Sequence, residues 1–521
     1  MEVPANTARN RALCDNIFVL LACIVNRIPL FLCGKPGSSK SSAVQILMSN
    51  LKGKKSKDSY FQTLPELVAV SFQGSQNCTS ESIIKVFERA AKYVGVQNNS
   101  EILPVIVFDE IGLAELSPHN PLKVLHAELE ADDNKYGFVG ISNWRLDASK
   151  MNRALYLSTP DPDVADLQST AYYDLYVHLK ESQREYENYF GLRDYYSLMK
   201  GIVRDTISVK DKDKLYETIR KQLKINFDGA YDGSQYLWEQ FCNYINRRNI
   251  IAQYKCPPFN HLLDQTLLTR SGRYLMLIAD NDSAIDYVER YIIVRQQREN
   301  KIIRTIVGSS FPGDLSSENA YAEDYNYRVL MDIILYAETP LTLIMRQMGH
   351  LYDNLYDLFN QNFAVSARKK YCRIALGALY HPRCLVHDDF YCIVFIHKRD
   401  LDQCDPPFLN RFEKHTIDIQ TLIHERHWLL SRQLYGWIEN CLPNNLGNNF
   451  PLLQHLFVDY SQDQLCSLVI DACEQLNIST DDENTPEKNL QIINYCQEKL
   501  LRTASFDLPL TLATQTSSEC Q

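Results

Sequence analysis

The sequence lacks the cysteine patterns of zinc-binding modules. Its 15 cysteines include no CxxC pair. Two late pairs, Cys384 with Cys392 and Cys466 with Cys473, do not have the spacing of a zinc knuckle or a RING-type site. No secretory signal precedes them, so we expect free thiols in a reducing compartment and a cytoplasmic location.

A basic surplus and a long apolar run are lacking as well. The net charge is −10, which argues against specific nucleic-acid binding as the main role. The apolar run at residues 17–25 is too short to cross a bilayer, so we expect no transmembrane segment there but a buried helix under the first strand. Apolar residues make up 45% of the chain, which is enough for several ordinary folded domains.

A glycine-rich loop stands between a predicted strand and a predicted helix. Residues 29–43 read PLFLCGKPGSSKSSA, the order of a P-loop, in which backbone N–H groups and the helix N-terminus bind phosphate oxygens. Lys40 is expected to reach the β- and γ-phosphates of ATP, and Ser41 to ligate Mg²⁺. The predicted nucleotide-binding loop comprises Gly34, Lys35, Pro36, Gly37, Ser38, Ser39, Lys40, Ser41 and Ser42.

Ser39 departs from the general P-loop pattern, which has glycine before the lysine. Serine costs some backbone freedom there but keeps its N–H donor. The alternative interpretation is a Gly/Ser turn that contains a lysine by chance.

Two further predicted strands end in residues suited to ATP hydrolysis. Residues 103–110 read LPVIVFDE, a buried strand of the Walker B type, which assigns Asp109 to Mg²⁺ and Glu110 to the attacking water. Residues 137–142 lead to Asn143, the position that orients this water in AAA+ proteins. The alternatives are a strand ending in a solvated acidic turn and an asparagine that opens a turn.

Two arginines follow in the order that AAA+ modules show. Arg153 precedes a predicted strand at residues 154–158, the place of an arginine finger directed at a neighbouring module. Arg193 follows Gly191 at the start of a predicted lid helix, where it would contact the γ-phosphate. Alternatively, Arg153 is a surface residue, and Arg193 pairs with Asp194 or with an acid one turn away.

The strand pattern restarts in the second half without the nucleotide-binding residues. Apolar runs occur at residues 274–279, 302–307, 341–345 and 391–397, and none of them leads into a glycine loop with Lys-Ser. The segment LNRFE at 409–413 resembles MNRAL at 151–155, and both precede a last predicted strand. We therefore predict a second module that supplies Arg411 to the ATP site of the first. The alternative is an ordinary α/β domain in which Arg411 caps a helix or pairs with a surface acid.

Together these signals predict an α/β fold: a P-loop AAA+ module with a helical lid, then a degenerate AAA+ module and a helical C-terminal part. The predicted domains are the first core at 1–165, its lid at 166–258, the degenerate core at 259–420 and the helical part at 421–521.

Long segments resemble the mysterin-type giant RING-finger E3 ubiquitin ligases, which carry a dynein-like row of AAA+ units. GKPGSSKS at 34–41, FDEIGLAELSPHNPLKVLHAELE at 108–130, GFVGISNWRLDASKMNRA at 137–154 and FGLRDYYSLMK at 190–200 are similar to the fourth unit of that row. FLNRFEKH at 408–415 is similar to the inactive unit that follows.

The resemblance implies an ATP- and Mg²⁺-dependent core whose partners are neighbouring AAA+ units or oligomer partners and the ubiquitin machinery. It also implies association with lipid droplets, and a role for Arg153 toward a preceding unit. Because RING spacing is lacking, the chain is expected to be a fragment or a shortened relative, and ubiquitin transfer is implied by the resemblance alone. Three interpretations stay open: an ATPase motor or switch, a scaffold that binds ATP with little turnover, and a ligase component acting by shape change.

Overall fold

The structure is a computed structural model of the 521-residue chain. It describes residues 1–4, 7, 9–76, 78–95, 102–130, 135–159, 174, 175, 177, 189–207, 211–229, 232–244, 254, 256–270, 272–309, 320–376, 382–417, 423–440, 457, 462–478 and 485–504. Two compact units are present. The first comprises Met1–Pro257, Asp264–Ile278 and Arg290–Thr416, and the second comprises Pro258–Leu263, Ala279–Glu289 and Ile417–Gln521.

A five-stranded parallel sheet forms the core of the N-terminal half, with strand order β2-β3-β4-β1-β5. Its strands are β1 (Leu30–Cys33), β2 (Glu66–Gln73), β3 (Ile102–Asp109), β4 (Gly137–Ser142) and β5 (Leu155–Ser158). Strands β1, β3 and β4 are apolar along nearly their whole length, as expected of strands that helices cover on both faces. The strands predicted from the apolar runs are thereby confirmed.

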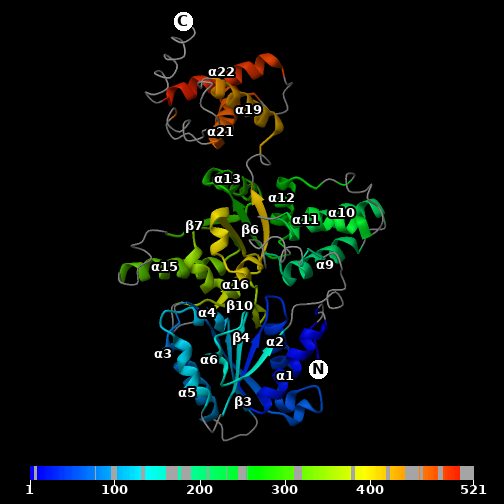
Figure 1. Ribbon diagram of the computed structural model, residues 1–521, viewed down its shortest axis with the longest axis vertical. Coiled ribbons are helices and arrows are strands. Elements are labelled where there is room, and N and C mark those ends of the chain that lie inside the picture. The colour runs from blue at the N-terminus through cyan, green and yellow to red at the C-terminus, as the bar shows by residue number, and fades with distance from the viewer. Residues whose placement is uncertain are drawn as a thin grey trace. The chain divides into compact units, whose positions relative to one another are not determined.

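Helices cover both faces of this sheet, and Figure 1 shows α1 and α2 on one side and α3 and α5 on the other. The helices are α1 (Arg11–Val25), α2 (Lys40–Asn50), α3 (Ser80–Gly95), α4 (Ile111–Glu115), α5 (Leu125–Leu129) and α6 (Ala148–Met151), with short 3-10 turns η1 (Gly53–Lys55), η2 (Phe61–Thr63) and η3 (Pro121–Val124). The predicted helix under the first strand is α1, whose Leu20 and Ile24 pack with Leu30 and Leu32.

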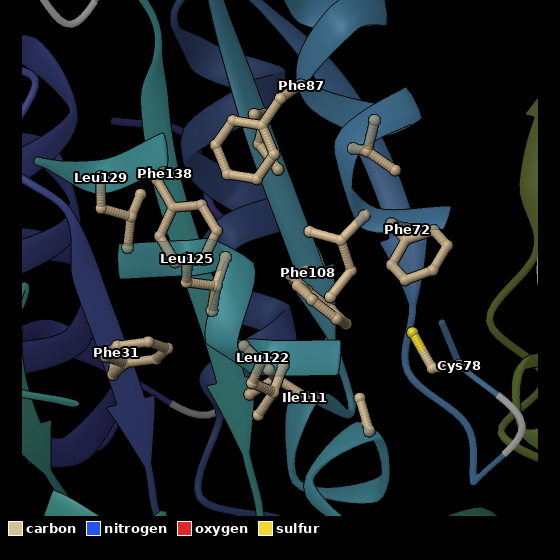
Figure 2. Packing of buried hydrophobic residues seen from close by; sticks show 14 of the residues in the cluster. Phe31, Phe72, Cys78, Phe87, Phe108, Ile111, Leu122, Leu125, Leu129 and Phe138 are labelled. Carbon is tan, nitrogen blue, oxygen red and sulfur yellow. The ribbon is translucent and has the colours of Figure 1, made fainter. Parts of the chain in front are cut away.

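Alternate residues of each strand enter separate apolar clusters on the two faces. Phe31, Phe108 and Phe138 belong to the cluster under α3 and α5 (Figure 2). Phe31 and Phe138 meet edge to face, with ring centroids 5.8 Å apart. Val105 and Val107 point to the opposite cluster, with α1 and α2. This packing on both faces fixes the position of each strand along its own axis, and therefore the position of its carboxyl end.

A helical segment follows the first sheet. It contains α9 (Leu192–Thr206), α10 (Lys212–Asn226) and α11 (Gly233–Tyr244). These helices fall within the predicted lid at 166–258, of which residues 166–173, 178–188 and several shorter stretches lie outside the described residues. The domain boundaries themselves stay predictions.

A second five-stranded sheet has the order β13-β6-β12-β8-β7. Its strands are β6 (Tyr274–Ala279), β7 (Ile302–Val307), β8 (Leu341–Arg346), β12 (Tyr391–His397) and β13 (Phe412–Ile417). Numbered within its own module, this order repeats that of the first sheet: fifth, first, fourth, third, second. The shared order explains the likeness of the segments before β5 and β13, because both lead into the strand that flanks the first strand of their sheet.

The helices of this second module are α12 (Phe259–Thr269), α13 (Asp282–Arg298), α15 (Ala320–Ala337), α16 (Tyr356–Phe359) and α17 (Pro406–Leu409), with 3-10 segments η6 (Gly349–Leu355) and η7 (Lys398–Gln403). Between β8 and β12 the chain also forms a small antiparallel sheet of order β11-β10-β9, from β9 (Ala364–Ser366), β10 (Lys369–Arg373) and β11 (Arg383–Val386). The sequence patterns did not predict this sheet.

The second unit contains α19 (Glu425–Asn440), α21 (Gln462–Gln475) and α22 (Pro486–Arg502). Leu434, Val469 and Ile492 are fully buried in their shared apolar cluster. The helical C-terminal part expected from the sequence is thus present.

Candidate functional site at the strand ends

The carboxyl ends of the central strands bring the predicted site residues to one edge of the first sheet. Cys33 of β1 lies in register with Ser142 of β4, and Gln73 of β2 with Asp109 of β3. The loop at residues 34–39, the acids Asp109 and Glu110, and Asn143 therefore emerge side by side. Ligand sites of open α/β sheets lie at this edge.

The loop after β1 has the backbone that a phosphate cradle needs. Gly37 has φ +88, and a Cβ there would lie 2.7 Å from the Cβ of Leu192 and 3.3 Å from the N of Arg193. Glycine is therefore needed both for the turn and for the close approach of the lid helix α9. Ser39 adopts the left-handed conformation at φ 62 and ψ 14, the region that favours glycine and that the general pattern fills with it.

Lys40 begins α2, and its side chain is directed back into the loop. Its Nζ donates to the carbonyl oxygens of Gly34 at 2.5 Å and Lys35 at 3.0 Å, and to Ser38 Oγ at 3.2 Å. Burial is the main cause that lowers its pKa, to about 8. An ammonium group held among loop carbonyls, at a helix N-terminus, is placed to bind an anion.

Glu110 lies between two donors from distant parts of the chain. Its Oε2 accepts a hydrogen bond from Asn143 Nδ2 at 2.6 Å, and its Oε1 accepts one from Arg411 Nη2 at 2.8 Å. The residue is left-handed, with φ 50 and ψ 40. Burial raises its pKa to about 7, against the opposing effect of Arg411.

Arg411 is held in place by the second module. Its side chain is fully buried, Nε donates to Asn360 Oδ1 at 2.8 Å, and Cζ lies 3.6 Å from the ring centroid of Tyr356. The interpretation of Arg411 as a helix cap or a partner of a surface acid is therefore wrong, because its acid partner is Glu110 at the strand ends of the first module.

Arg193 lies in the same charged cluster. Burial and the nearby Arg411 lower its pKa to about 10, while Glu110 and Asp109 act in the opposite direction. Nη1 of Arg193 and Nη1 of Arg411 are both buried and have no hydrogen-bond partner among the described residues. With Lys40, these two unpaired donors fit a multiply charged anion such as a triphosphate.

Asp194, next to Arg193, is fully buried and faces the second module. Its Oδ1 accepts from Arg273 Nη1 at 2.5 Å and from Lys414 Nζ at 3.3 Å, and its Oδ2 accepts from the N of Gly191 at 2.8 Å. The alternative in which Arg193 pairs with Asp194 is not seen, because other cations occupy that carboxylate.

Asp109 lies close to an ion pair that the sequence did not indicate. Arg373 Nε donates to Asp357 Oδ2 at 2.7 Å. The pKa of Asp109 is raised by burial and by Asp357 and lowered by Arg373. Nothing in the local sequence distinguishes Arg373 from a surface arginine, so the sequence did not predict a role for it.

The structure gives less support to the predicted roles of Arg153 and Ser41. Arg153 forms an ion pair with Glu130 of its own module. Ser41 lies in the first turn of α2, and its role as a Mg²⁺ ligand stays a prediction. No group of three or more His, Cys, Asp or Glu side chains that could hold a metal occurs among the described residues. A Mg²⁺ ion held by Asp109, Ser41 and phosphate oxygens does not require such a group, because Mg²⁺ in nucleotide sites keeps several waters.

The fold and the arrangement of the site define a pair of AAA+ modules, of which only the first carries a P-loop. Comparison with known families agrees. Residues 6–166 and residues 264–423 each match a family described as RNF213 AAA domain. Together the two matches span more than half of the 521 residues, and the chain belongs to the RNF213 AAA domain family. The resemblance to mysterin-type ligases is thereby confirmed.

Similar full-length proteins extend the match over most of the chain. E3 ubiquitin-protein ligase rnf213-beta of Danio rerio is 34% identical over 448 residues, which cover 80% of this chain and 9% of the relative. E3 ubiquitin-protein ligase RNF213 of Homo sapiens is 30% identical over 507 residues, 90% of this chain and 10% of the relative. The protein of the same name in Mus musculus is 30% identical over 518 residues, 91% of this chain and 10% of the relative. The chain thus spans about a tenth of the length of these relatives.

Within the described part of the chain, no helix is long and apolar enough to cross a membrane.

Proposed function

We propose that the chain binds and hydrolyses ATP with Mg²⁺ in the first module, and that the second module completes the site. The observation that carries this proposal is the position of Glu110, which contacts Asn143 at 2.6 Å and Arg411 at 2.8 Å. An acid, an amide and a guanidinium from three segments meet beside the phosphate loop. This combination suits in-line attack of water on a terminal phosphate.

Each group has a role in the proposed reaction. The loop at residues 34–42 and Lys40 would bind the phosphates, and Ser41 and Asp109 would hold Mg²⁺, which would supply charge neutralisation at the phosphates. Glu110 orients the attacking water and takes its proton. Asn143 fixes the carboxylate of Glu110. Nη1 of Arg193 and Nη1 of Arg411 are buried without a hydrogen-bond partner in the described part of the chain, and they would stabilise the charge that develops on the γ-phosphate.

The wider setting is proposed from the relatives, which are named E3 ubiquitin-protein ligases. We propose that this pair of modules is the motor or switch part of such a ligase, acting in the cytoplasm beside other AAA+ units and the ubiquitin machinery. Ubiquitin transfer would then require parts of the relatives that this chain does not match.

A second candidate is an ATP-binding clamp with little turnover. It is favoured by the state of Glu110, because both of its carboxylate oxygens are already hydrogen-bonded. Burial also raises its pKa to about 7, so that a substantial fraction is protonated at neutral pH. Such a carboxylate orients water only after one of its two contacts has opened.

Steady-state ATP hydrolysis, with bound nucleotide quantified, tests both candidates. The wild type, Glu110→Gln and the control Glu88→Gln, at an exposed position on α3, are compared. If the first proposal is right, the wild type and the control turn over ATP, while Glu110→Gln binds ATP and retains it. Bound ATP without turnover in all three supports the clamp. Failure of all three to bind ATP refutes both candidates.

A further inference from the structure

Two adjacent residues of α16 in the second module each hold an arginine near the acids of the first. The ring of Tyr356 lies 3.6 Å from Cζ of Arg411, and Asp357 accepts the Nε of Arg373 at 2.7 Å. Arg411 contacts Glu110 directly. Asp109, the residue just before Glu110, lies in register with Gln73 of β2, whose side chain donates to the carbonyl oxygen of Asp353 in the segment that leads to α16.

The surrounding segment is anchored to the strand ends of the first module. Gln73, at the end of β2, donates to the carbonyl oxygen of Asp353 at 3.3 Å. Gln45, on the P-loop helix α2, donates to Asn362 Oδ1 at 2.5 Å. Residues 353–362 are therefore tied to the first module on both sides of α16, and the register of the two arginines against the two acids is fixed.

Arg373 has binding capacity that its own ion pair does not use. A guanidinium carries five N–H donors, and Nε is engaged by Asp357. Nη1 is buried with no hydrogen-bond partner among the described residues. A buried donor is costly to leave unpaired. Asp357 is itself buried, with 6% of its side chain exposed, so it holds Arg373 rigidly.

We propose that Arg373 is a second arginine that the second module contributes to the ATP site of the first, held by Asp357 and binding the triphosphate on the Asp109 side. This inference rests on the proposed ATP site. The second module then contacts the nucleotide through two segments, the small sheet at β10 and the segment before β13. Arg373 joins the module to the Asp109 side of the phosphates, and Arg411 joins it to the Glu110 side.

The test compares the affinities for Mg-ATP and Mg-ADP by equilibrium binding, in the Glu110→Gln background so that no ATP is consumed. The variants are Arg373→Gln, Arg373→Lys and Asp357→Asn. The control is Arg383→Gln, the exposed residue in register with Arg373 on β11. Thermal unfolding of each variant reports on folding.

Loss of one charged hydrogen bond corresponds to about 10- to 100-fold in affinity. Arg373→Gln is expected to lower the affinity for ATP by that factor and the affinity for ADP by much less. Arg373→Lys restores part of the loss, Asp357→Asn gives a smaller loss of the same kind, and the control binds like its parent. A merely structural arginine would lower thermal stability and affect ATP and ADP equally.

The assignment would be overturned if Arg373→Gln lost equal affinity for ATP and ADP. It would also be overturned if the affinities of this variant stayed within about twofold of the parent's. If Arg373→Gln does not fold, the ATP-to-ADP ratio of Asp357→Asn decides in the same way. Failure of the parent itself to bind ATP is a different result, because it refutes the proposed ATP site and the role of Arg373 with it.

Discussion

Removing the guanidinium of Arg411 tests whether the second module completes the proposed ATP site of the first. Arg411→Ala deletes two hydrogen bonds, to Glu110 and Asn360, and the contact with the Tyr356 ring. Hydrogen bonds to charged groups contribute about 1.5–3 kcal/mol each, and a desolvated cation–π contact about 2 kcal/mol. These terms overlap, and breaking a buried ion pair by removing one partner costs about 3–5 kcal/mol. We expect a loss of stability in that range.

The effect on catalysis should be larger than the effect on ATP binding. If Arg411 stabilises the transferring phosphoryl group as other arginine fingers do, turnover falls by about 10³-fold. The phosphate loop and Lys40 remain intact, so ATP affinity should change little.

The pH dependence separates this role from general damage. In the wild type burial raises the pKa of Glu110 to about 7, although Arg411 lowers it, so turnover should rise with pH through about 7 as the carboxylate ionises. Without Arg411 the pKa of Glu110 rises further, and the midpoint of the pH–turnover profile moves to higher pH.

The same pKa shift makes the free energy of unfolding depend on pH. A carboxyl whose pKa is raised on folding contributes stability at acidic pH that is lost as pH rises through the folded-state value. Arg411→Ala should therefore lose more stability at pH 8 than at pH 6.

The assay measures turnover from pH 6 to 9, together with urea unfolding at pH 6 and pH 8. Arg399→Ala, with 78% of its side chain exposed, is the control and should match the wild type. Unchanged turnover in Arg411→Ala would refute its role in hydrolysis. An unchanged pH midpoint would refute the electrostatic coupling of Arg411 with Glu110.

Three further substitutions test other parts of the site. Lys40→Ala should abolish nucleotide binding, measured by equilibrium dialysis, and retained ATP affinity would contradict the P-loop assignment. Ser39→Gly should stabilise the chain by about 1 kcal/mol, since φ is 62 and a left-handed conformation costs a non-glycine residue about that much; an unchanged urea midpoint would argue against strain there. Asp194→Asn should lower the free energy of unfolding by about 3 kcal/mol, because Arg273 and Lys414 both lose their buried carboxylate partner. A urea midpoint equal to that of the wild type would show that this cluster contributes little to stability.

The sequence predicted the parts of the fold that have strong local signals. Apolar runs such as residues 302–307 and 391–397 became β7 and β12, and the glycine loop marked the start of α2. Strand ends in a parallel sheet meet at one edge, so the sequence could place Asn143 and Glu110 in one site, but their contact is seen only in the structure. Arg411 was predicted from its place before the last strand of a repeated module.

The remaining site residues had no such signal. The strands of the small sheet that carries Arg373 are only three to five residues long, and Val365 within it is 71% exposed, so alternation of apolar residues does not reveal it. Tyr356, Asp357 and Asn360 reach the site through contacts with Arg411 or Arg373, which lie elsewhere in the sequence. Their importance depends on the tertiary structure and cannot be recovered from a local pattern.

The position of α16 has a consequence for reading natural sequence variation in this family. A substitution at Tyr356, Asp357 or Asn360 lies far along the chain from the phosphate loop, within a module that has no P-loop of its own. By sequence position it would be classified as a change in a non-catalytic region. In the structure it changes the contacts that hold Arg411 or Arg373, and its phenotype should therefore group with lesions of the proposed ATP site.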